Sequence, residues 1–496
     1  MNMKKKLVAL AIALLLLVGL TPMALAQYTY PWYTSYMIQN LDTSNQANVV
    51  VAYYDSSGNH VVGADRSLTI PPGGQVTVVQ YTDDPLLNGV YSAVVSSDRP
   101  VAVIVNQQTA PPGRTYMAST PPFASYTGFE SGSTQVTLPE IMYNWYGYYT
   151  EFFVQTVGDG QANVQVTYYP GLAGASGVTE TASIPQYASR RFSQKEKSSL
   201  GAPSGTHAGR FIGSAVISST QPVVAVVNEH NERAQKLFTY NGFSSGATDL
   251  VAPSILRGHY GWYTSLSIAN PSLSQTAYVT ITYYADTVYS LPEGLRGTTV
   301  VKTFTIAPGK SLTRYDGTGA SPTMDPSLSD LTAFTRFFGT ARIRSNIPVV
   351  AKVNQENDSG NAEAYNCIDA SQASKKVVVP LVQADFYGFY TSLTVQNMVG
   401  LTGTITITYT SDGSYSNPTN TSITVVRSIG PYSQYNSWEG GISTTGDVHN
   451  SGRFTRFNGS AVIESTVPIV AIVNEEKRGS GADYGYSFNV INIPTP

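Results

Sequence analysis

The chain has 496 residues, with 29 Lys and Arg against 32 Asp and Glu, which gives a formal net charge of −3. That balance excludes the strongly basic surface by which proteins bind nucleic acid. Charged residues make up only 12% of the chain while tyrosine occurs 34 times, a composition that favours sheets and turns over helices.

Residues 1–26 have the pattern of a cleaved signal peptide. Three lysines at residues 4–6 precede an apolar run at residues 7–20, and the sequence Ala24-Leu25-Ala26 fits a signal-peptidase site. A membrane anchor is the competing interpretation, which the short apolar run and the cleavage site disfavour. We therefore expect a secreted protein, extracellular or at the cell surface, that begins at Gln27 and has no membrane span.

One motif returns four times along the rest of the chain. A proline is followed by a β-branched apolar run and, six residues later, by asparagine; the four prolines are Pro100, Pro222, Pro348 and Pro468. A return at this regular spacing indicates four copies of one structural unit. Each copy predicts a strand, a short turn and a second strand, of which the second is apolar on both faces and therefore central.

Other segments of each unit alternate apolar and polar residues, and none of useful length has a helical period. We expect six to eight short strands in each unit, separated by Gly, Pro, Ser and Asn turns. The predicted fold class is all-β, with four tandem Ig-like antiparallel β-sandwich domains. The predicted boundaries are 27–132, 133–247, 248–374 and 375–482 for the four repeats, with a C-terminal tail at 483–496.

An aromatic residue opens an equivalent strand in every repeat. The four residues are Trp32, Tyr148, Trp262 and Phe389. An aromatic at a strand opening is most often a lid on the sandwich core, because one ring buries a large apolar area. The other interpretation is an exposed aromatic platform on which a cell-surface glycan could stack.

Polar clusters follow the central strand in three repeats. They are Asn228–Glu229, residues 355–358 and residues 474–476. Several converging oxygens could bind calcium between domains, although the first repeat has Asn106 and two glutamines there, without a carboxylate. That departure favours solvated hairpin ends over a metal site.

The rest of the sequence gives no sign of catalysis. Five histidines are scattered in predicted loops without the spacing of metal ligands, and no nucleophile elbow or phosphate-binding loop occurs. We expect no cofactor, no metal and no enzymatic activity. The single cysteine, Cys367, excludes an intramolecular disulfide and is interpreted as a buried thiol or as an intermolecular bridge.

A short apolar strand that contains proline precedes the second, third and fourth repeats at a fixed distance. Pro139, Pro253 and Pro380 each lie nine residues before the opening aromatic. Nine residues before Trp32 lies Met23, inside the predicted signal peptide. The mature first repeat is therefore expected to lack its first strand.

The end of the chain resembles the strand that the first repeat lacks. This segment is Asn489, Val490, Ile491, Asn492, Ile493 and Pro494, and no repeat follows it. One missing strand and one spare strand predict head-to-tail strand donation between subunits. Two alternatives are that the tail folds back on the fourth repeat, or that residues 27–31 complete the first.

The chain as a whole resembles the tandem Ig-like repeat proteins of bacterial cell surfaces, which include surface-layer, stalk and fibre subunits. The resemblance rests on export, composition and repeat architecture, and implies a structural or adhesive role. We therefore expect a non-enzymatic homopolymer, assembled head to tail into a filament or surface layer. The alternative is a monomeric secreted adhesin or glycan-binding module; nucleic acid is not an expected partner.

Overall fold

A computed structural model describes residues 32–80, 89–109, 120–317, 328–440, 445–477 and 485–493. The described chain consists mainly of antiparallel strands, with several sheets, and this confirms the expected all-β fold. Three-residue 3-10 turns interrupt the strands at η1 (Val62–Ala64), η2 (Gln194–Glu196), η3 (Ser198–Leu200), η4 (Glu293–Leu295), η6 (Ala370–Gln372) and η7 (His449–Ser451).

The first two repeats contain the strands β1 to β14. Repeat 1 contains β1 (Trp32–Asn40), β2 (Ala47–Tyr54), β3 (Arg66–Ile70), β4 (Gln75–Val79), β5 (Ser92–Ser97), β6 (Val101–Thr109) and β7 (Thr120–Thr127). Repeat 2 contains β8 (Ser133–Tyr143), β9 (Tyr149–Thr156), β10 (Ala162–Ala173), β11 (Val178–Ile184), β12 (Ser189–Ser193), β13 (Phe211–Asn231) and β14 (Lys236–Asn241).

The last two repeats follow the order of repeat 2 and add one short strand. Repeat 3 contains β15 (Ala247–His259), β16 (Trp262–Ala269), β17 (Ala277–Ala285), β18 (Thr299–Ile306), β19 (Ser311–Tyr315), β20 (Phe337–Asn357), β21 (Ala362–Asn366) and β22 (Ile368–Asp369). Repeat 4 contains β23 (Ser374–Ala384), β24 (Phe389–Asn397), β25 (Gly403–Ser411), β26 (Ser422–Ile429), β27 (Gln434–Trp438), β28 (Phe457–Lys477), β29 (Tyr486–Asn489) and β30 (Ile491–Ile493).

The central strand of repeats 2, 3 and 4 is continuous, where the sequence predicted a turn. The strands β13, β20 and β28 each run for 21 residues through the proline. The first half of β13 pairs with β8 and β10, and the second half pairs with β9 and β14. Pro222 lies where these partners change, so its missing N–H breaks no ladder. In repeat 1 the strand is divided into β5 and β6, with Pro100 between them.

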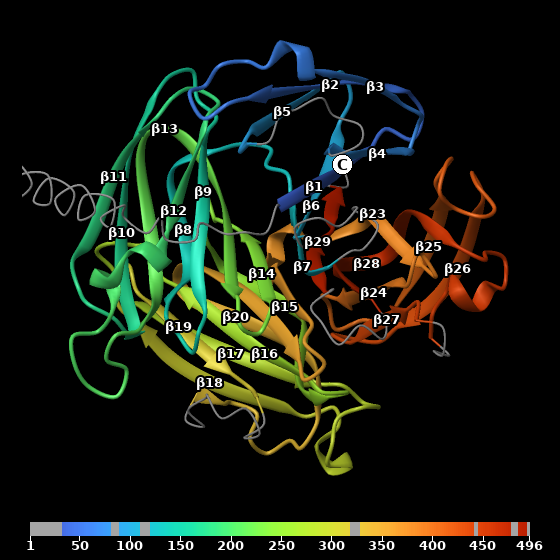
Figure 1. Ribbon diagram of the computed structural model, residues 1–496. Coiled ribbons are helices and arrows are strands. Elements are labelled where there is room, and N and C mark those ends of the chain that lie inside the picture. The colour runs from blue at the N-terminus through green and yellow to red at the C-terminus, as the bar shows by residue number, and fades with distance from the viewer. Residues whose placement is uncertain are drawn as a thin grey trace, which may run out of the picture.

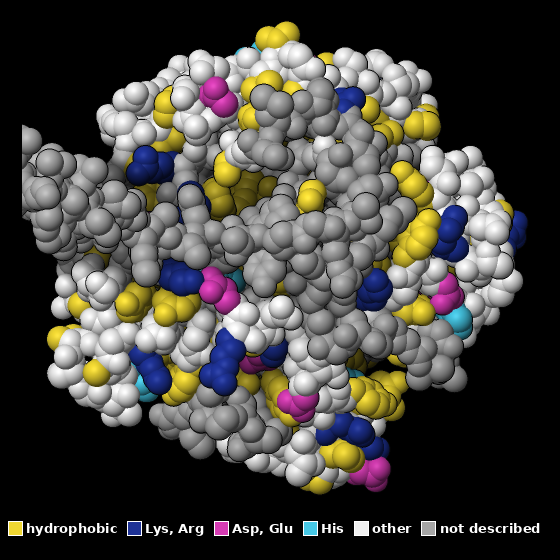
Figure 2. All heavy atoms as spheres, viewed as in Figure 1, with side chains coloured by type: hydrophobic (Ala, Val, Ile, Leu, Met, Phe, Trp, Pro, Cys, Tyr) yellow, Lys and Arg dark blue, Asp and Glu magenta, His cyan; other side chains and the backbone are white. Residues whose placement is uncertain are grey.

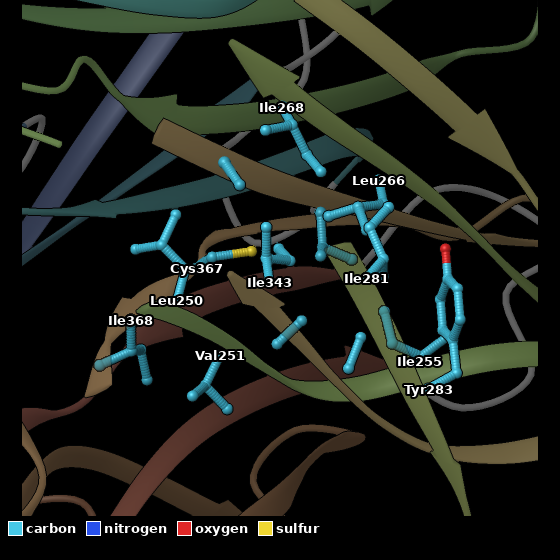
Figure 3. Close-up of a cluster of buried hydrophobic side chains, with 14 of the residues drawn as sticks. Leu250, Val251, Ile255, Leu266, Ile268, Ile281, Tyr283, Ile343, Cys367 and Ile368 are labelled. Carbon is cyan, nitrogen blue, oxygen red and sulfur yellow. The ribbon is translucent and has the colours of Figure 1, made fainter. Parts of the chain in front are cut away.

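Each sandwich encloses apolar side chains from alternate positions of its strands. Figure 3 shows the cluster of repeat 3, where Leu250, Ile281 and Ile343 point toward one another from β15, β17 and β20. The sulfur of Cys367 lies inside this cluster, and the residue is 5% exposed. Burial raises the pKa of the Cys367 thiol, so the structure supports the interpretation as a buried thiol.

The C-terminal segment is paired within its own repeat, and the expectation of a spare strand is wrong. β29 pairs with β28, and β30 pairs with β23, where Ile491 lies opposite Val378. Ile368 lies opposite Val251 in the same way in repeat 3. Residues 485–493 are therefore the last strands of repeat 4, and the predicted boundary at 482 falls too early. Pro494 lies outside the described residues.

The four repeats form a closed ring. Their last long strands contact one another in cyclic order, β7 with β14, β14 with β21, β21 with β29 and β29 with β7. In Figure 1 the blue, green, yellow and orange-red repeats follow one another around a common centre. The same kind of contact recurs between neighbours, β8 on β16, β15 on β24 and β23 on β1, so repeat 4 packs on repeat 1 as repeat 2 packs on repeat 3. The head-to-tail contact is thus made within one chain.

In the portion of the chain that the structure describes, no helix is long and apolar enough to cross a membrane.

Candidate functional site

A ring of amide and carboxylate side chains surrounds the centre of the molecule. Each repeat contributes two neighbouring residues, namely the asparagine six positions after the motif proline and the residue that follows this asparagine. We call these four pairs the inner ring: Asn106–Gln107, Asn228–Glu229, Asn354–Gln355 and Asn474–Glu475. At three junctions the asparagine Nδ2 donates to the preceding repeat: Asn228 to Gln107 at 3.2 Å, Asn354 to Glu229 at 2.7 Å, and Asn474 to Gln355 at 2.9 Å. The sequence motif therefore marks the contacts between repeats.

The polar clusters after the central strand are partly buried, whereas solvated hairpin ends were expected. Glu229, Gln355 and Glu475 are each fully buried, because the neighbouring repeat covers them. Among the described residues, no group of three or more acidic, histidine or cysteine side chains is placed to hold a metal ion. The inner ring therefore serves as a polar contact layer between repeats in this structure.

The junction between repeats 2 and 3 contains a buried ionic cluster. Lys352 Nζ lies 2.8 Å from a carboxylate oxygen of Glu229 and also pairs with Glu140. Burial, together with the charge of Glu140, raises the pKa of Glu229 against the opposing effect of Lys352. Lys352 corresponds to Ile472 in the next repeat, where the chain uses an apolar residue. One buried ammonium thus faces two buried carboxylates at this junction.

The junction between repeats 4 and 1 leaves two polar atoms without partners. Glu475 accepts a hydrogen bond from Thr391 at Oε1. Its Oε2 and the Oδ1 of Asn106 are buried and have no hydrogen-bond partner among the described residues. Burial raises the pKa of Glu475 well above its ordinary value. Burial without a second partner thus favours the neutral form of this carboxyl group.

A recess of about 280 Å³ lies at the centre of the ring, and we call it the axial recess. The ends of β7, β14 and β29 and the end of β21 with β22 line it, so all four repeats contribute. Two exposed serines, Ser244 and Ser245, also line it. The volume lies just below the usual range of small-molecule sites.

Asparagine side chains tie the four lining strands together. Asn241 Nδ2 donates to the Thr127 carbonyl at 2.8 Å, Asn366 Nδ2 to the Asn241 carbonyl at 2.8 Å, and Asn489 Nδ2 to the Asn366 carbonyl at 2.6 Å. Repeat 1 has threonine where the others have asparagine, and Ser125 Oγ closes the circle by donating to the Ser487 carbonyl at 3.1 Å. The wall of the recess is therefore held in place on every side.

The lining of the axial recess is polar and almost uncharged. Of the described residues that line it, Asp369 alone has a charged side chain, and that carboxylate accepts the backbone N–H of Ser371. The Oδ1 atoms of Asn241 and Asn366 accept no hydrogen bond from the described residues. Tyr126 adds an aromatic ring, and burial raises its pKa to about 12. Such a lining suits a neutral ligand with hydroxyl groups better than an ion.

The four predicted aromatic residues do not form one platform. Tyr148 lies at the junction of repeats 2 and 3, where its hydroxyl donates to Glu356 at 3.3 Å. Phe389 lies at the junction of repeats 4 and 1, with its ring 5.6 Å from that of Phe123. Trp262 is half-buried at the start of β16. Trp32 opens β1, and its side chain lies outside the described part.

Sequence reasoning missed the residues of the axial recess. Asn241, Asn366 and Asn489 each follow an aromatic residue and precede an apolar residue by two positions. This motif occurs once at the end of repeats 2, 3 and 4, and it was a usable signal. The predicted set at residues 489–494 includes Asn489, which the structure assigns to the recess wall instead of to an intermolecular strand.

Comparisons with protein-family descriptions and with curated proteins give no match. The chain has partial similarity to two solved structures. The crystal structure of Thermotoga maritima 1070 matches at 20% identity over 25% of this chain and 95% of that chain, with a TM-score of 0.18. The major pilin of Streptococcus pyogenes matches at 9% identity over 56% of this chain and 92% of that chain, with a TM-score of 0.13.

Proposed function

We propose that the protein is a secreted, non-enzymatic binding protein that acts as a single ring and holds a neutral, hydroxyl-rich ligand in the axial recess. The ligand class is a saccharide, or the end of a glycan. The observation that carries this proposal is the recess itself, a polar hollow of about 280 Å³ to which all four repeats contribute.

The chemistry of the lining supports a saccharide. Amide groups such as that of Asn366 offer both acceptors and donors to hydroxyl groups, and aromatic rings pack against the apolar face of a sugar. A phosphate or carboxylate ligand would need a cation, and the described lining offers none. On the face in Figure 2, basic and acidic side chains are interspersed, so no large field of one sign is visible there.

The ring also favours a monomer over the expected polymer. A linear polymer needs an unused head-to-tail contact, and repeat 4 already makes that contact with repeat 1. It also needs a donor strand, and β30 is already paired with β23. Both features support the monomeric alternative, in which the chain binds a partner by itself.

The test is direct binding of saccharides to the chain that starts at Gln27. Neutral mono- and oligosaccharides are screened on an array, and each positive is measured by calorimetry. Ser245→Trp places a large ring at the rim of the recess and should weaken binding at least tenfold, because the ring blocks the ligand. The substitution should not disturb the fold, since Ser245 makes no hydrogen bond among the described residues.

Ser176→Trp is the matched control, since Ser176 is exposed and is not part of the recess lining. It should bind as the unmodified chain does. Two results would overturn the proposal. One is an array on which no saccharide binds, and the other is a bound saccharide for which the Ser245→Trp and Ser176→Trp variants have the same affinity.

A further inference from the structure

Within the described part of the chain, repeat 1 leaves open a strand edge that is filled in the other three repeats. In repeat 2 the first strand, β8, pairs with the first half of β13, with Leu138 opposite Ala215 and Val136 opposite Ile217. β15 and β23 pair with β20 and β28 in the same way. In repeat 1 the corresponding strand is β5, and among the described residues β5 pairs only with β2.

The alignment between repeats follows from the strand on the other side. Tyr53 lies opposite Ala93 in repeat 1, and Tyr168 lies opposite Ala215 in repeat 2. Ala93 is therefore the counterpart of Ala215, and Val95, two residues on, is the counterpart of Ile217.

Exposure differs between these counterparts as a missing strand predicts. Ala215 and Ile217 are both 0% exposed, whereas Ala93 is exposed and Val95 is only half-buried. The equivalent residues of repeats 3 and 4 are buried too: Ala341, Ile343, Ala461 and Ile463. An edge of this kind presents backbone hydrogen-bonding groups and apolar side chains together.

We propose that β5 binds an extended segment of another polypeptide by antiparallel strand addition. The three internal copies define what fits: two apolar residues separated by one position, followed by proline, as in residues 136–139, 250–253 and 377–380. In these copies the two apolar side chains are buried against the core. Leu138 and Val136, which lie opposite Ala215 and Ile217, are uncharged. The partner is therefore a neutral, strand-forming segment with this pattern. The proposal is independent of the axial recess.

The experiment uses the chain that starts at Gln27 and a fluorescent peptide with the sequence of residues 133–143. We expect saturable binding, seen as a rise in anisotropy, together with a raised melting temperature. A peptide with Val136→Asp and Leu138→Asp should bind at least tenfold more weakly. A peptide of residues 486–493 should also fail to bind, because that segment pairs on the opposite side of a first strand.

A pair of protein variants locates the site. Ala93→Trp fills the open edge from an exposed position and should weaken peptide binding at least tenfold. Val62→Trp changes a residue of the same repeat that is 69% exposed, and should leave binding unchanged. Circular dichroism of both variants shows whether the sheet is retained.

Two results would overturn the proposal. One is the absence of peptide binding to a folded chain. The other is slow hydrogen exchange, in the free protein, of those β5 amides that point away from β2, which would show that residues of the same chain already cover the edge.

Discussion

The position after the inner-ring asparagine is occupied by glutamine in repeats 1 and 3 and by glutamate in repeats 2 and 4. Gln355 satisfies both ends of its amide, since Nε2 donates to Ser254 Oγ at 3.0 Å and Oε1 accepts from Asn474. Among the described residues, Glu475 has only Thr391 as a hydrogen-bond partner, and its second oxygen has none. A side chain that must stay neutral to be buried is thus a source of pH dependence.

Glu475→Gln is expected to stabilise the protein at alkaline pH and to change little at pH 5. Burial raises the pKa of Glu475 in the folded chain. Above a pH of about 4.5 the unfolded chain has released the proton of this carboxyl group, whereas the folded chain still binds it. Stability therefore falls as pH rises through this window, and glutamine removes that dependence. Urea unfolding at pH 5 and pH 8 should show a gain of about 1–3 kcal/mol at pH 8 only.

Glu464→Gln is the control for this prediction, because Glu464 lies on the same strand, β28, and is exposed. It should show no gain that depends on pH. Equal effects of the two substitutions would contradict a pKa of Glu475 that is raised by burial.

At the scale of the element, the C-terminal strands complete the core of repeat 4. Tyr486, Phe488 and Val490 are at most 6% exposed and belong to the same apolar cluster as Val377 and Ile463. β30 covers the outer side of β23, and β29 covers the second half of β28. The last residues are therefore part of the fold and are not an accessory tail.

Deleting residues 486–496 should unfold repeat 4. Truncating one buried aromatic side chain costs about 3–5 kcal/mol, and the deletion removes two of them with their backbone pairing. Hydrogen exchange should then be fast in β23 and β28 and unchanged in β10 and β13. Deleting residues 494–496 alone is the control and should leave exchange as it is. A truncated chain with a protected repeat 4 would restore the spare-strand hypothesis.

The sequence predicted the elements well wherever the repeats agree. Alternation through Val164, Val166 and Tyr168 placed β10 with one face on the core, and all three are buried. The absence of a first strand in repeat 1 was predicted from spacing alone and stays a prediction, because the residues before Trp32 lie outside the described part. Such features depend on local pattern, which the printed sequence contains.

The fate of the C-terminal strand could not be read from proline spacing. Ile493 and Pro494 imitate the apolar–proline strand, but register is decided by the neighbouring aromatic at Phe488, which matches Tyr240 and Tyr365. The axial recess was missed for a related reason: its walls come from four segments far apart in the chain. The asparagine motif repeats along the chain, but no single stretch of sequence shows that its copies meet around one recess.

At the scale of the whole molecule, the ring predicts a compact particle. The 470 residues that remain of the 496 after a 26-residue leader should have a radius of gyration of about 23 Å if they are packed as one body. Four such domains in a row would have a radius of gyration of roughly 40 Å. Small-angle X-ray scattering of the chain from Gln27 should give the smaller value at all protein concentrations tested. The larger value would contradict the ring.

The junction of repeats 4 and 1 offers a second check on this prediction. Phe123 is 6% exposed and packs in the apolar cluster of repeat 4. Phe123→Asp places a charge in that contact and should open the ring there, which raises the radius of gyration while the circular dichroism stays that of folded β-sheet. Phe123→Leu keeps the contact apolar and should preserve the compact particle.

The hydrogen bond from Ser125 to Ser487 joins residues 362 positions apart, and it makes closure an intramolecular event. The local concentration of one end for the other is then set by chain connectivity, in the millimolar range for such linkages, so dilution does not open the ring. Each position around the circle is also encoded separately. A ring of four identical subunits would have to repeat a buried lysine four times, whereas this chain bears the cost of Lys352 at a single junction and keeps apolar residues such as Ile472 elsewhere.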